Sequence, residues 1–331
     1  MRLVIPARAK INLTLEVLSL RRDGYHEIRT VLQALELHDR VVLEKAEGIH
    51  VFSSLPEVPL GEANLAYRAA LALRQYRGGA SGAAACGSSI FIEKNIPLAA
   101  GLAGGSADAA ATLRALNELW ALGLNRGELA EIGASLGSDV PFCLDGVTAL
   151  ATGRGEKLEP LPPLPPLHVV LAKPEFGVST AWAYAEYDRS KEDKAASSGA
   201  APEGPDRGTA ASEPAVPRTT AHEQAAPGTA APGKEVPSLV LSRAIQEGDA
   251  VRVGQLLHND LAGVVSRAHP IIADLKKHLN AAGALGAEMS GSGPTVYGLF
   301  GDEGTALQAA QRLQGLVPTI LVTRTWLGEW Q

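Results

Sequence analysis

The sequence predicts an α+β fold of two domains from its length, its mixture of helical and strand patterns, and one proline-rich segment. The chain has 331 residues, more than the ~250–300 at which a single hydrophobic core stops growing. Helical and strand-like segments both occur, but they do not alternate regularly as in a doubly wound sheet. The stretch "PLPPLPPL" forms a stiff connection. We therefore expect one domain over residues 1–155 and a second over residues 156–331.

Strand patterns dominate the first part of the chain. Leu3 to Leu20 alternates with a period close to two, which predicts one or two strands, and Asp23-Gly24 in "RRDGYH" favours a turn after them. "TVLQALELHDRVVLEKA" predicts another pair of strands, and "SSIFIEKNIP" predicts a short strand that ends at its proline. Between these strands, apolar residues recur at helical spacing from Asn64 to Tyr76, which predicts a helix with an asparagine cap.

Helical patterns are more frequent further along the chain. After a glycine-rich loop we expect a helix from about Ala107 to Leu122, and a shorter helix from Asn125 to Leu136 leads into "GSDVPFCLDG". "SLVLSRAIQEGDAVRVGQLLHNDL" and "PIIADLKKHLNAAGA" also have helical patterns. "GAEMSGSGPTVYGLFG" places a second glycine-serine turn before a strand, and "TILVTRTWLGEW" resembles a strand.

One segment has a different composition from the rest. From Arg189 to Pro237 there is no Leu, Ile, Met, Phe, Tyr, Trp or Cys. Such a segment cannot bury enough apolar area to offset the entropy of ordering it. We expect a disordered insertion that enlarges a surface loop, which is tolerated because the cost of loop closure grows slowly with length.

Charge and cysteine content narrow the class of protein. The net charge of -6 gives no basic field that would attract nucleic acid or an acidic membrane surface. Two cysteines cannot form a disulfide framework, and no Cys/His cluster has zinc spacing. "MRLVIPARAKINLTLEV" lacks the apolar core of a signal peptide, and no run of ~20 apolar residues is present to span a bilayer. We expect a cytoplasmic protein.

The glycine-rich loop "GLAGGSADAA" is the first stretch that suggests chemistry. Gly101, Gly104 and Gly105 precede Ser106, which we expect at the N-cap of the following helix. The unpaired N–H groups of a helix N-terminus bind anions, and glycines let a phosphate approach the backbone closely. The loop is neither a Walker A motif nor a dinucleotide-binding fingerprint. Taken alone, a plain strand–helix connection explains it equally well.

Three other stretches carry polar residues with a possible chemical role. Lys10 and Asn12 face one side of a strand, although a lysine there also protects an edge strand against aggregation. Asp139 follows a Gly-Ser turn, where it could accept a proton from an alcohol or serve only as a turn or N-cap residue. Ser290 to Gly293 form a second small-residue turn, whose alternative is a hairpin.

Together, and in this order, the four stretches resemble the GHMP kinase superfamily. "GLAGGSADAA" is similar to its phosphate loop, and "SGSGPTVYGLF" to its C-terminal glycine motif. Within that superfamily, "ARAKINLTLEVLSLRRDGYHEIRTVLQALELHDRV", "NLAYRAA", "GSDVPF" and "GVSTAWAYAEYD" resemble the members that act on 4-diphosphocytidyl-2-C-methyl-D-erythritol. The resemblance covers nearly the whole chain except the low-complexity insertion.

The resemblance implies a fold and a reaction. The N-terminal domain would be like ribosomal protein S5 domain 2 and would bind ATP, and the C-terminal domain would be ferredoxin-like and would bind the second substrate. The γ-phosphate of ATP, with Mg²⁺, would move to the 2-hydroxyl of 4-diphosphocytidyl-2-C-methyl-D-erythritol in the non-mevalonate isoprenoid pathway. These two small molecules would be its partners, without nucleic acid or membrane, and the protein would be a monomer or a homodimer.

The resemblance also assigns residues. Asp139 would be the general base or would orient the hydroxyl, and Lys10 would keep that carboxylate ionised and steady charge on the substrate oxygen. The phosphate loop would comprise Pro97, Leu98, Ala99, Ala100, Gly101, Leu102, Ala103, Gly104, Gly105, Ser106 and Ala107. Adenosine would lie near Asn64, Leu65, Lys94 and Asn95. The cytidyl substrate would contact Asn12, Tyr25, His26, Asp139, Thr180 and Tyr184, with Trp182 as the alternative residue that stacks on cytosine.

Two departures from the family pattern and two rival functions remain. Ala103 replaces a glycine of the phosphate loop; a positive φ there would cost about 1 kcal/mol, and we expect a negative φ. The insertion from Arg189 is absent from typical members. The rivals are a homoserine or mevalonate type of kinase and a non-catalytic S5-like module that binds RNA. "DGYHE" argues against the first rival, while the negative charge and the Lys10/Asp139 pair argue against the second.

Overall fold

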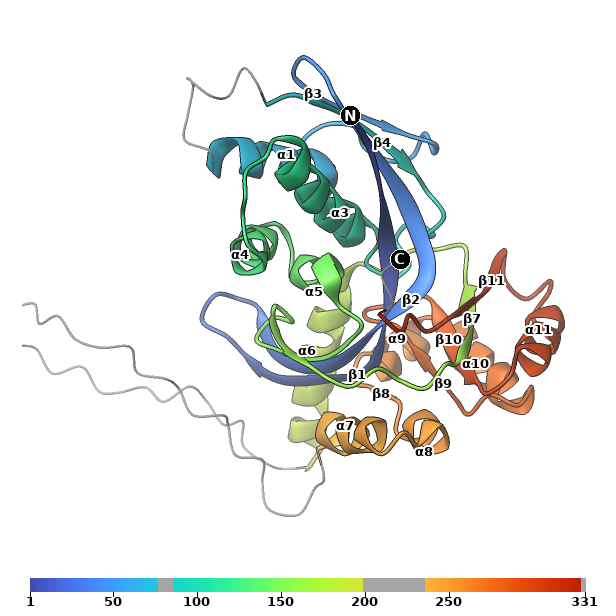
Figure 1. Ribbon diagram of the computed structural model, residues 1–331. Helices are drawn as coiled ribbons and strands as arrows, with labels where there is room; N and C mark the ends of the chain where they lie inside the picture. The colour runs from blue at the N-terminus through green and yellow to red at the C-terminus, as the bar shows by residue number, and fades with distance from the viewer. Residues whose placement is uncertain (77–85, 199–235, 329–331) are drawn as a thin grey trace, which may run out of the picture.

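The computed structural model describes residues 1–76, 86–198 and 236–328, which form two β-sheets and the helices packed on them (Figure 1). In the first half the elements are β1 (Arg2–Leu20), β2 (His26–Lys45), β3 (Ile49–Ser53), α1 (Leu65–Tyr76), β4 (Ser88–Glu93), α3 (Gly104–Leu119), α4 (Arg126–Leu136), α5 (Val140–Asp145), β5 (Thr148–Thr152) and β6 (Lys157–Pro160). In the second half they are β7 (His168–Lys173), α6 (Thr180–Ser198), α7 (Pro237–Gln246), α8 (Ala250–Gln255), β8 (His258–Asn259), α9 (Ala262–Ala268), α10 (Ile271–Ala281), β9 (Gly286–Met289), β10 (Val296–Phe300), α11 (Glu303–Arg312) and β11 (Thr319–Arg324).

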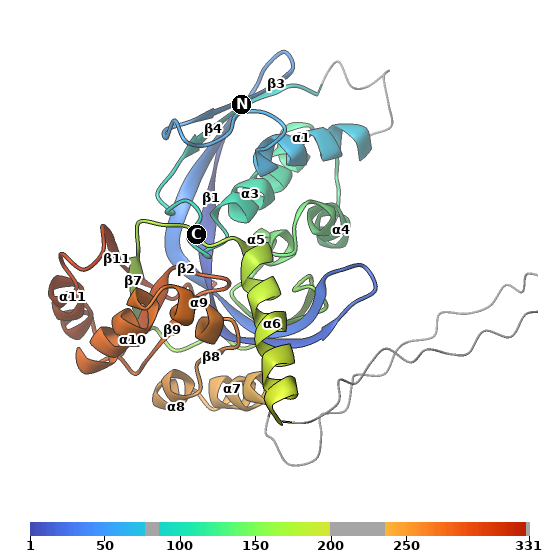
Figure 2. The same cartoon turned by 180° about the vertical axis from the view of Figure 1, so that it is seen from behind.

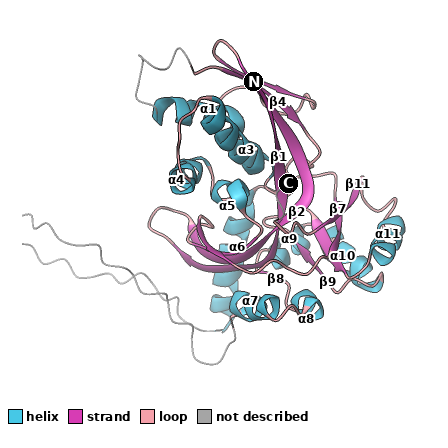
Figure 3. Cartoon of the chain, viewed as in Figure 1, coloured by secondary structure: helices cyan, strands magenta, loops and turns pink. Residues whose placement is uncertain are grey.

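A long antiparallel pair of strands, β1 and β2, forms the centre of the first sheet, and we call this pair the ribbon (Figure 3). The strand order is β3-β4-β2-β1-β8, and β5 pairs with β2 and with β6. The pair of strands expected over "TVLQALELHDRVVLEKA" is wrong, because β2 is one continuous strand. Register shifts such as that between Arg8 and Lys10 bend the ribbon, so the chain curves without breaking the strand.

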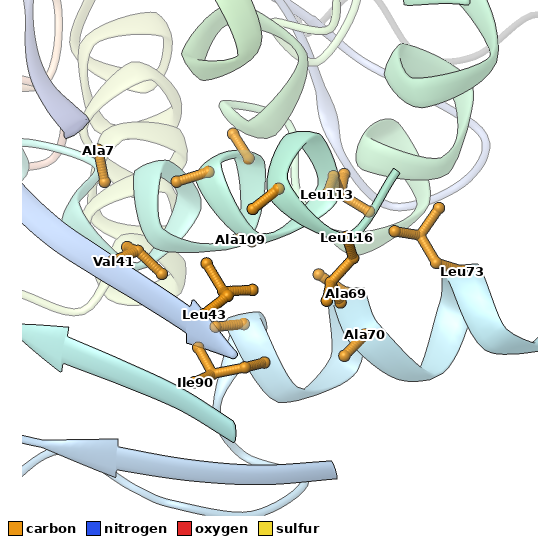
Figure 4. Packing of buried hydrophobic residues seen from close by; sticks show 14 of the residues in the cluster. Ala7, Val41, Leu43, Ala69, Ala70, Leu73, Ile90, Ala109, Leu113 and Leu116 are labelled. Carbon is orange, nitrogen blue, oxygen red and sulfur yellow. The ribbon is translucent and has the colours of Figure 1, made fainter. Parts of the chain in front are cut away.

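Helices α1 and α3 cover one face of this sheet, and small side chains let them approach it closely. Figure 4 shows Ala109, Leu113 and Leu116 of α3 packed between the strands and Leu73 of α1. These leucines are fully buried, and each contributes roughly 2 kcal/mol from removal of its side chain from water. The alanine-rich start of α3 therefore serves to bring its N-terminus down onto the sheet.

The second sheet has the order β11-β7-β10-β9, and all its pairings are antiparallel. Numbered along the chain, its strands lie in the order 4-1-3-2, which is the ferredoxin-like arrangement. The helices α10 and α11 pack on this sheet around Leu275, Leu279 and Phe300. The α+β fold class is thus confirmed, with the ferredoxin-like unit in the C-terminal half.

Local signals account for the helices that the sequence predicts best. Asn64 caps α1 by accepting a hydrogen bond from the N–H of Ala66 at 2.8 Å, and Asn125 forms a capping box with Glu128 at the start of α4. The expected strands at the C-terminus and after the second glycine turn are confirmed as β11 and β10. No helix in the described segments is long and apolar enough to cross a membrane.

The expected insertion begins too early in our prediction. Arg189 to Ser198 belong to α6, which runs without a break from Thr180. A helix needs no apolar residue in its exposed last turns, so composition alone placed the boundary too close to Tyr187. Residues 199–235, the rest of that prediction, lie outside the described residues.

Candidate active site

A cleft of about 770 Å³ lies where the β1–β2 ribbon, the phosphate loop, α6 and the second glycine turn meet. Figure 2 shows α6 crossing the curved ribbon on this side of the molecule. The residues from the sequence prediction that line the cleft are Lys10, Asn12, Tyr25, His26, Ala99, Gly101, Ala103, Asp139, Thr180 and Tyr184. Segments from both halves of the chain therefore form one site.

Lys10 is the buried cation at the centre of the cleft. Its Nζ donates hydrogen bonds to Asn12 Oδ1 at 2.8 Å and to the Gly101 carbonyl at 3.3 Å, and it lies 3.6 Å from Asp139 Oδ2. Asn12 in turn donates to Thr30 Oγ1 at 2.9 Å. A buried ammonium requires such partners, since desolvation without them would cost several kcal/mol. The side chain is therefore fixed between the ribbon, the phosphate loop and Asp139, which is unlike an edge-strand lysine.

Asp139 occupies the N-cap position of α5, but its side chain forms no capping hydrogen bond. Pro141 stands in the first turn of α5 and fixes the backbone direction after the Gly-Ser-Asp turn. The Asp139 side chain is 35% exposed, whereas that of Lys10 is 5% exposed. One face of the carboxylate thus meets a buried ammonium while the rest of the group is open to a ligand in the cleft.

The phosphate loop corrects two of our expectations. Ala103 has φ 58°, in the left-handed region, and not the negative φ that we expected. Helix α3 begins at Gly104, so Ala103 is its N-cap and Ser106 lies inside the first turn. The left-handed backbone at Ala103 costs roughly 1–2 kcal/mol for a residue with a Cβ. This alanine is held in place because the loop is packed on both sides.

The second glycine turn is part of that packing. A Cβ added to Gly101, whose φ is +75°, would lie 2.3 Å from the carbonyl oxygen of Ser290, so only glycine fits there. The Ser290 hydroxyl donates to the Gly101 carbonyl at 2.9 Å. Asn259 Nδ2 donates to the Gly291 carbonyl at 2.8 Å. The turn does connect the β9–β10 hairpin, and it also closes over the phosphate loop at the cleft.

An imidazole and two phenol rings lie at the other end of the cleft. The His26 ring stacks on Tyr184 with centroids 4.8 Å apart, and its Nε2 lies 2.9 Å from Asp188 Oδ1. Trp182 instead lies edge-on to His269 at 6.0 Å and does not line the cleft. Burial, together with the charges of Asp139 and Asp260, raises the pKa of Tyr184, so its hydroxyl stays protonated. Of the two aromatics that we weighed, Tyr184 is the one that faces the cleft.

The residues that we expected near adenosine do not line this cleft. Asn64 is 6% exposed, and its side chain accepts the capping hydrogen bond of α1 and donates to the Pro59 carbonyl. Leu65 lies beside Gly105, 3.7 Å from a Cβ placed there. Asn95 donates through Nδ2 to the His38 carbonyl at 3.0 Å.

Lys94 differs most from its expected role. Its side chain is 2% exposed, and its ammonium pairs with Asp39 and, at 2.8 Å, with Asp108. Burial raises the pKa of Asp108 to about 7, against the attraction of Lys94. The Lys94 ammonium therefore faces inward beneath the phosphate loop, where a Cβ added to Gly104 would lie 3.3 Å from it. The assignment of Lys94 to the surroundings of the adenosine stays a prediction, and its ammonium is already paired with two carboxylates.

Several residues of the cleft were missed in the sequence. Asp188 stands four residues after Tyr184, so helical spacing could have placed both on one face of α6. Ser292 hydrogen-bonds to Thr180 across the cleft at 3.0 Å, and Arg154 lies over the Tyr25 ring at 5.0 Å. No local pattern signals Arg154, because Tyr25 is far from it in the sequence.

Comparisons with known proteins agree with this geometry. The family described as GHMP kinases N terminal domain matches residues 64–147, and the one described as GHMP kinases C terminal matches residues 241–318. The chain is 46% identical to 4-diphosphocytidyl-2-C-methyl-D-erythritol kinase of Synechococcus sp. (strain JA-2-3B'a(2-13)), over 93% of this chain and 88% of the relative. It is 45% identical to the kinase of the same name from Pelotomaculum thermopropionicum (strain DSM 13744 / JCM 10971 / SI), over 97% and 96% of the two chains.

Solved structures give the same result at the level of the fold. A crystal structure of 4-(cytidine 5'-diphospho)-2C-methyl-D-erythritol kinase is 31% identical, with a TM-score of 0.70 over 99% of this chain and 100% of that one. Homoserine kinase from Cytophaga hutchinsonii, at 17% identity and a TM-score of 0.66, covers 98% of this chain and 94% of its own, and it shares only the fold. The chain belongs to the 4-diphosphocytidyl-2-C-methyl-D-erythritol kinase family of the GHMP kinases.

Proposed function

We propose that this chain transfers the γ-phosphate of ATP to the 2-hydroxyl of 4-diphosphocytidyl-2-C-methyl-D-erythritol, in the non-mevalonate pathway to isoprenoid precursors. The observation that carries the proposal is the Lys10–Asp139 pair, with Nζ and Oδ2 3.6 Å apart in the cleft beside both glycine turns. The names of the relatives, which cover nearly the whole chain, support this substrate over those of other GHMP kinases.

Asp139 is the group that would handle the proton of the acceptor hydroxyl. Its carboxylate accepts the proton, or the hydrogen bond that orients the hydroxyl, while the oxygen forms its bond to the γ-phosphorus and ADP leaves. Lys10 lies 3.6 Å from this carboxylate and would stabilise negative charge on the attacking oxygen. Phosphoryl transfer depends mainly on positioning and charge neutralisation, and the Asn12 and Gly101 contacts of Lys10 supply that positioning.

The triphosphate would lie on the phosphate loop at the N-terminus of α3. Here α3 has unpaired N–H groups in its first turn, and Gly104 and Gly105 place no side chain over them. We assign the loop from Pro97 to Ala107 to the phosphates. We assign the positions that flank the loop, Asn64, Leu65, Lys94 and Asn95, to the surroundings of the adenosine.

Mg²⁺ fits the oxygen groups at the junction of the loop and the Asp139 turn. No cluster of three or more acidic, His or Cys side chains that could enclose a metal occurs in the described parts of the chain. A Mg²⁺ ion that accompanies ATP needs only one or two protein oxygens besides phosphates and water. Ser106 Oγ lies in the first turn of α3 near Gly137, so this hydroxyl is our proposed protein ligand. When bound, the ion would neutralise charge on the phosphates.

The cytosine would be recognised at the His26 end of the cleft. Asp188 accepts the Nε2 proton of His26 at 2.9 Å, which leaves Nδ1 as an acceptor for the exocyclic amine of the base. Tyr184 and Tyr25 also line the cleft, as do Thr180 and Asn12, whose polar groups we assign to the rest of the substrate. Uracil carries an acceptor in place of that amine, so this arrangement favours cytosine.

The domain assignment follows from these roles. We propose that residues 1–155 bind ATP and carry Lys10 and Asp139, and that residues 156–331 contribute Thr180 and Tyr184 to the substrate end. The cleft then lies between the two units, which is where small-molecule sites commonly form.

An assay of ADP release with three alcohols tests the proposed function. We expect turnover with 4-diphosphocytidyl-2-C-methyl-D-erythritol and none above background with homoserine or mevalonate. The product should carry its new phosphate on the 2-hydroxyl, as ³¹P–¹H correlation would detect. Comparable turnover with either of the other alcohols would overturn the substrate assignment while leaving the kinase class intact.

A further inference from the structure

The loop that joins β5 to β6 forms part of the rim of the cleft and carries one arginine between two glycines. Gly153 and Gly155 have φ +75° and +108°, so both need the left-handed backbone that glycine provides. The Ile28 N–H donates to the Gly153 carbonyl at 2.7 Å, and the Gly153 N–H donates to Glu27 Oε1 at 3.0 Å. These bonds to β2 fix the backbone that carries Arg154.

Arg154 lies between the two ends of the cleft. Its guanidinium carbon is 5.0 Å from the centre of the Tyr25 ring, at the aromatic end. The next residue, Gly155, lies close to the turn that carries Asp139, since a Cβ added to Gly155 would lie 3.9 Å from the Cβ of Ser138. The loop therefore extends from the aromatic end of the cleft, where we place the cytosine, toward the end that carries Asp139, where we place the reacting hydroxyl.

The described part of the chain gives the Arg154 guanidinium no ion pair, although, after the hydrogen bond from the Tyr25 N–H, the Arg154 charge is one of the smaller causes that lower the pKa of Asp23. Lys10 and Arg154 are the lysine and arginine that line the cleft within the described residues, and Lys10 is already held by Asp139 and Asn12. No carboxylate of the described residues lies within ion-pair distance of the Arg154 guanidinium. Asp23, on the same rim, is paired with Arg21 at 3.2 Å.

A diphosphate is the group that best complements such a cation. It carries two negative charges, and the guanidinium fork binds phosphate oxygens through two parallel hydrogen bonds. In a cytidyl diphosphate substrate this group separates the base from the alcohol, and Arg154 lies between the two corresponding ends of the cleft. We propose that Arg154 binds the substrate diphosphate and so fixes the distance between base and reacting hydroxyl. This role rests on the function proposed above.

Binding of cytidine, CMP and CDP to the full chain, measured by calorimetry, tests the proposal. In the unaltered protein affinity should rise from cytidine to CDP. Arg154→Ala should lower CDP affinity by about 10- to 100-fold, the range for hydrogen bonds to charged groups, and leave cytidine affinity unchanged. Arg154→Lys should recover part of the loss, because it restores the charge without the planar fork.

Lys157→Ala is the matched control, since Lys157 is an exposed cation three residues away that does not line the cleft. It should bind all three ligands like the unaltered protein. Equal CDP affinity in Arg154→Ala and the unaltered protein would overturn the proposal, as would a parallel loss for cytidine. If the unaltered protein phosphorylates the cytidyl substrate while Arg154→Ala retains its KM, the proposed function stands and the Arg154 assignment fails.

Discussion

Ala103 shows how a single residue can carry strain at the candidate site. Its φ of 58° is one that glycine adopts freely and alanine does not. The loop around it is held by Ser290 and by the Lys10 contact to Gly101, so the backbone cannot relax. Sequence alone could not settle this angle, because the packing that imposes it comes from the second glycine turn.

Ala103→Gly should therefore stabilise the protein by about 1 kcal/mol, as the relief of strain outweighs the added freedom of the unfolded chain. Chemical denaturation of the two proteins measures the difference. Ala107→Gly is the matched control: Ala107 is buried inside α3, and a glycine there should destabilise by about 1 kcal/mol. If Ala103→Gly lowered the free energy of unfolding as much as Ala107→Gly, the proposed backbone strain at Ala103 would be contradicted.

His26 is predicted to bind the cytosine of the cytidyl substrate and not ATP. His26→Ala should raise the KM for the cytidyl substrate far more than the KM for ATP, because its Nδ1 and its stacked face lie at the Tyr184 end of the cleft. Steady-state kinetics with each substrate varied in turn gives both values. Asp188→Ala should weaken discrimination between cytidyl and uridyl analogues, since the ring would lose its fixed tautomer. Equal effects on both substrates would remove His26 from base recognition.

At the scale of elements, local sequence signals predicted the helices whose caps are close in the chain. They failed for features that depend on contacts between distant segments. The caps at Asn64 and Asn125 predicted α1 and α4 because capping is a local interaction. The continuous β2 was missed because irregularities in both strands of the ribbon, and not a turn, allow it to bend. The pairing of Lys94 with Asp39 was not predicted, because the two residues lie 55 positions apart in the sequence.

The attachment of α6 to the first sheet depends on a small charged network. Tyr187 of α6 donates to Asp260 Oδ2 at 3.3 Å, and the Val17 N–H of β1 donates to the same oxygen at 2.8 Å. His258 donates to Asp260 Oδ1 at 2.8 Å, which raises the pKa of His258. Burial alone would raise the pKa of Asp260, but the hydrogen bonds from His258 and Val17 lower it.

His258→Gln should therefore cost more stability at about pH 6 than at about pH 9. A raised histidine pKa contributes stability that is fully present below the unfolded value of about 6.5 and is lost as pH rises through the folded value. We expect up to about 1 kcal/mol at the lower pH, because the side chain is partly exposed and the pair is screened. Urea titrations at both pH values measure it. His50→Gln, at an exposed position of β3, is the control. The same cost at both pH values in His258→Gln would contradict the ion pair.

At the scale of the whole molecule, the chain after α6 returns to the first sheet before it completes the second. Ser238 of α7 hydrogen-bonds to Thr14 of β1 at 2.8 Å, and β8 pairs in parallel with β1 at Thr14 and Leu15. The candidate site thus draws on segments more than 200 residues apart. Motifs in the sequence predicted Lys10, Asp139 and both glycine turns. Helical spacing from Tyr184 could have indicated Asp188, whereas Arg154 follows only from the tertiary arrangement.

The central claim is that Lys10 and Asp139 catalyse phosphate transfer from ATP to the hydroxyl of a cytidyl diphosphate substrate in this cleft. The turnover of Asp139→Asn with 4-diphosphocytidyl-2-C-methyl-D-erythritol and saturating ATP tests it most directly. The amide keeps the shape of the side chain but cannot take the proton, so kcat should fall by at least about 100-fold while ATP affinity changes little. A kcat close to that of the unaltered protein would contradict the claim and remove Asp139 from the chemistry.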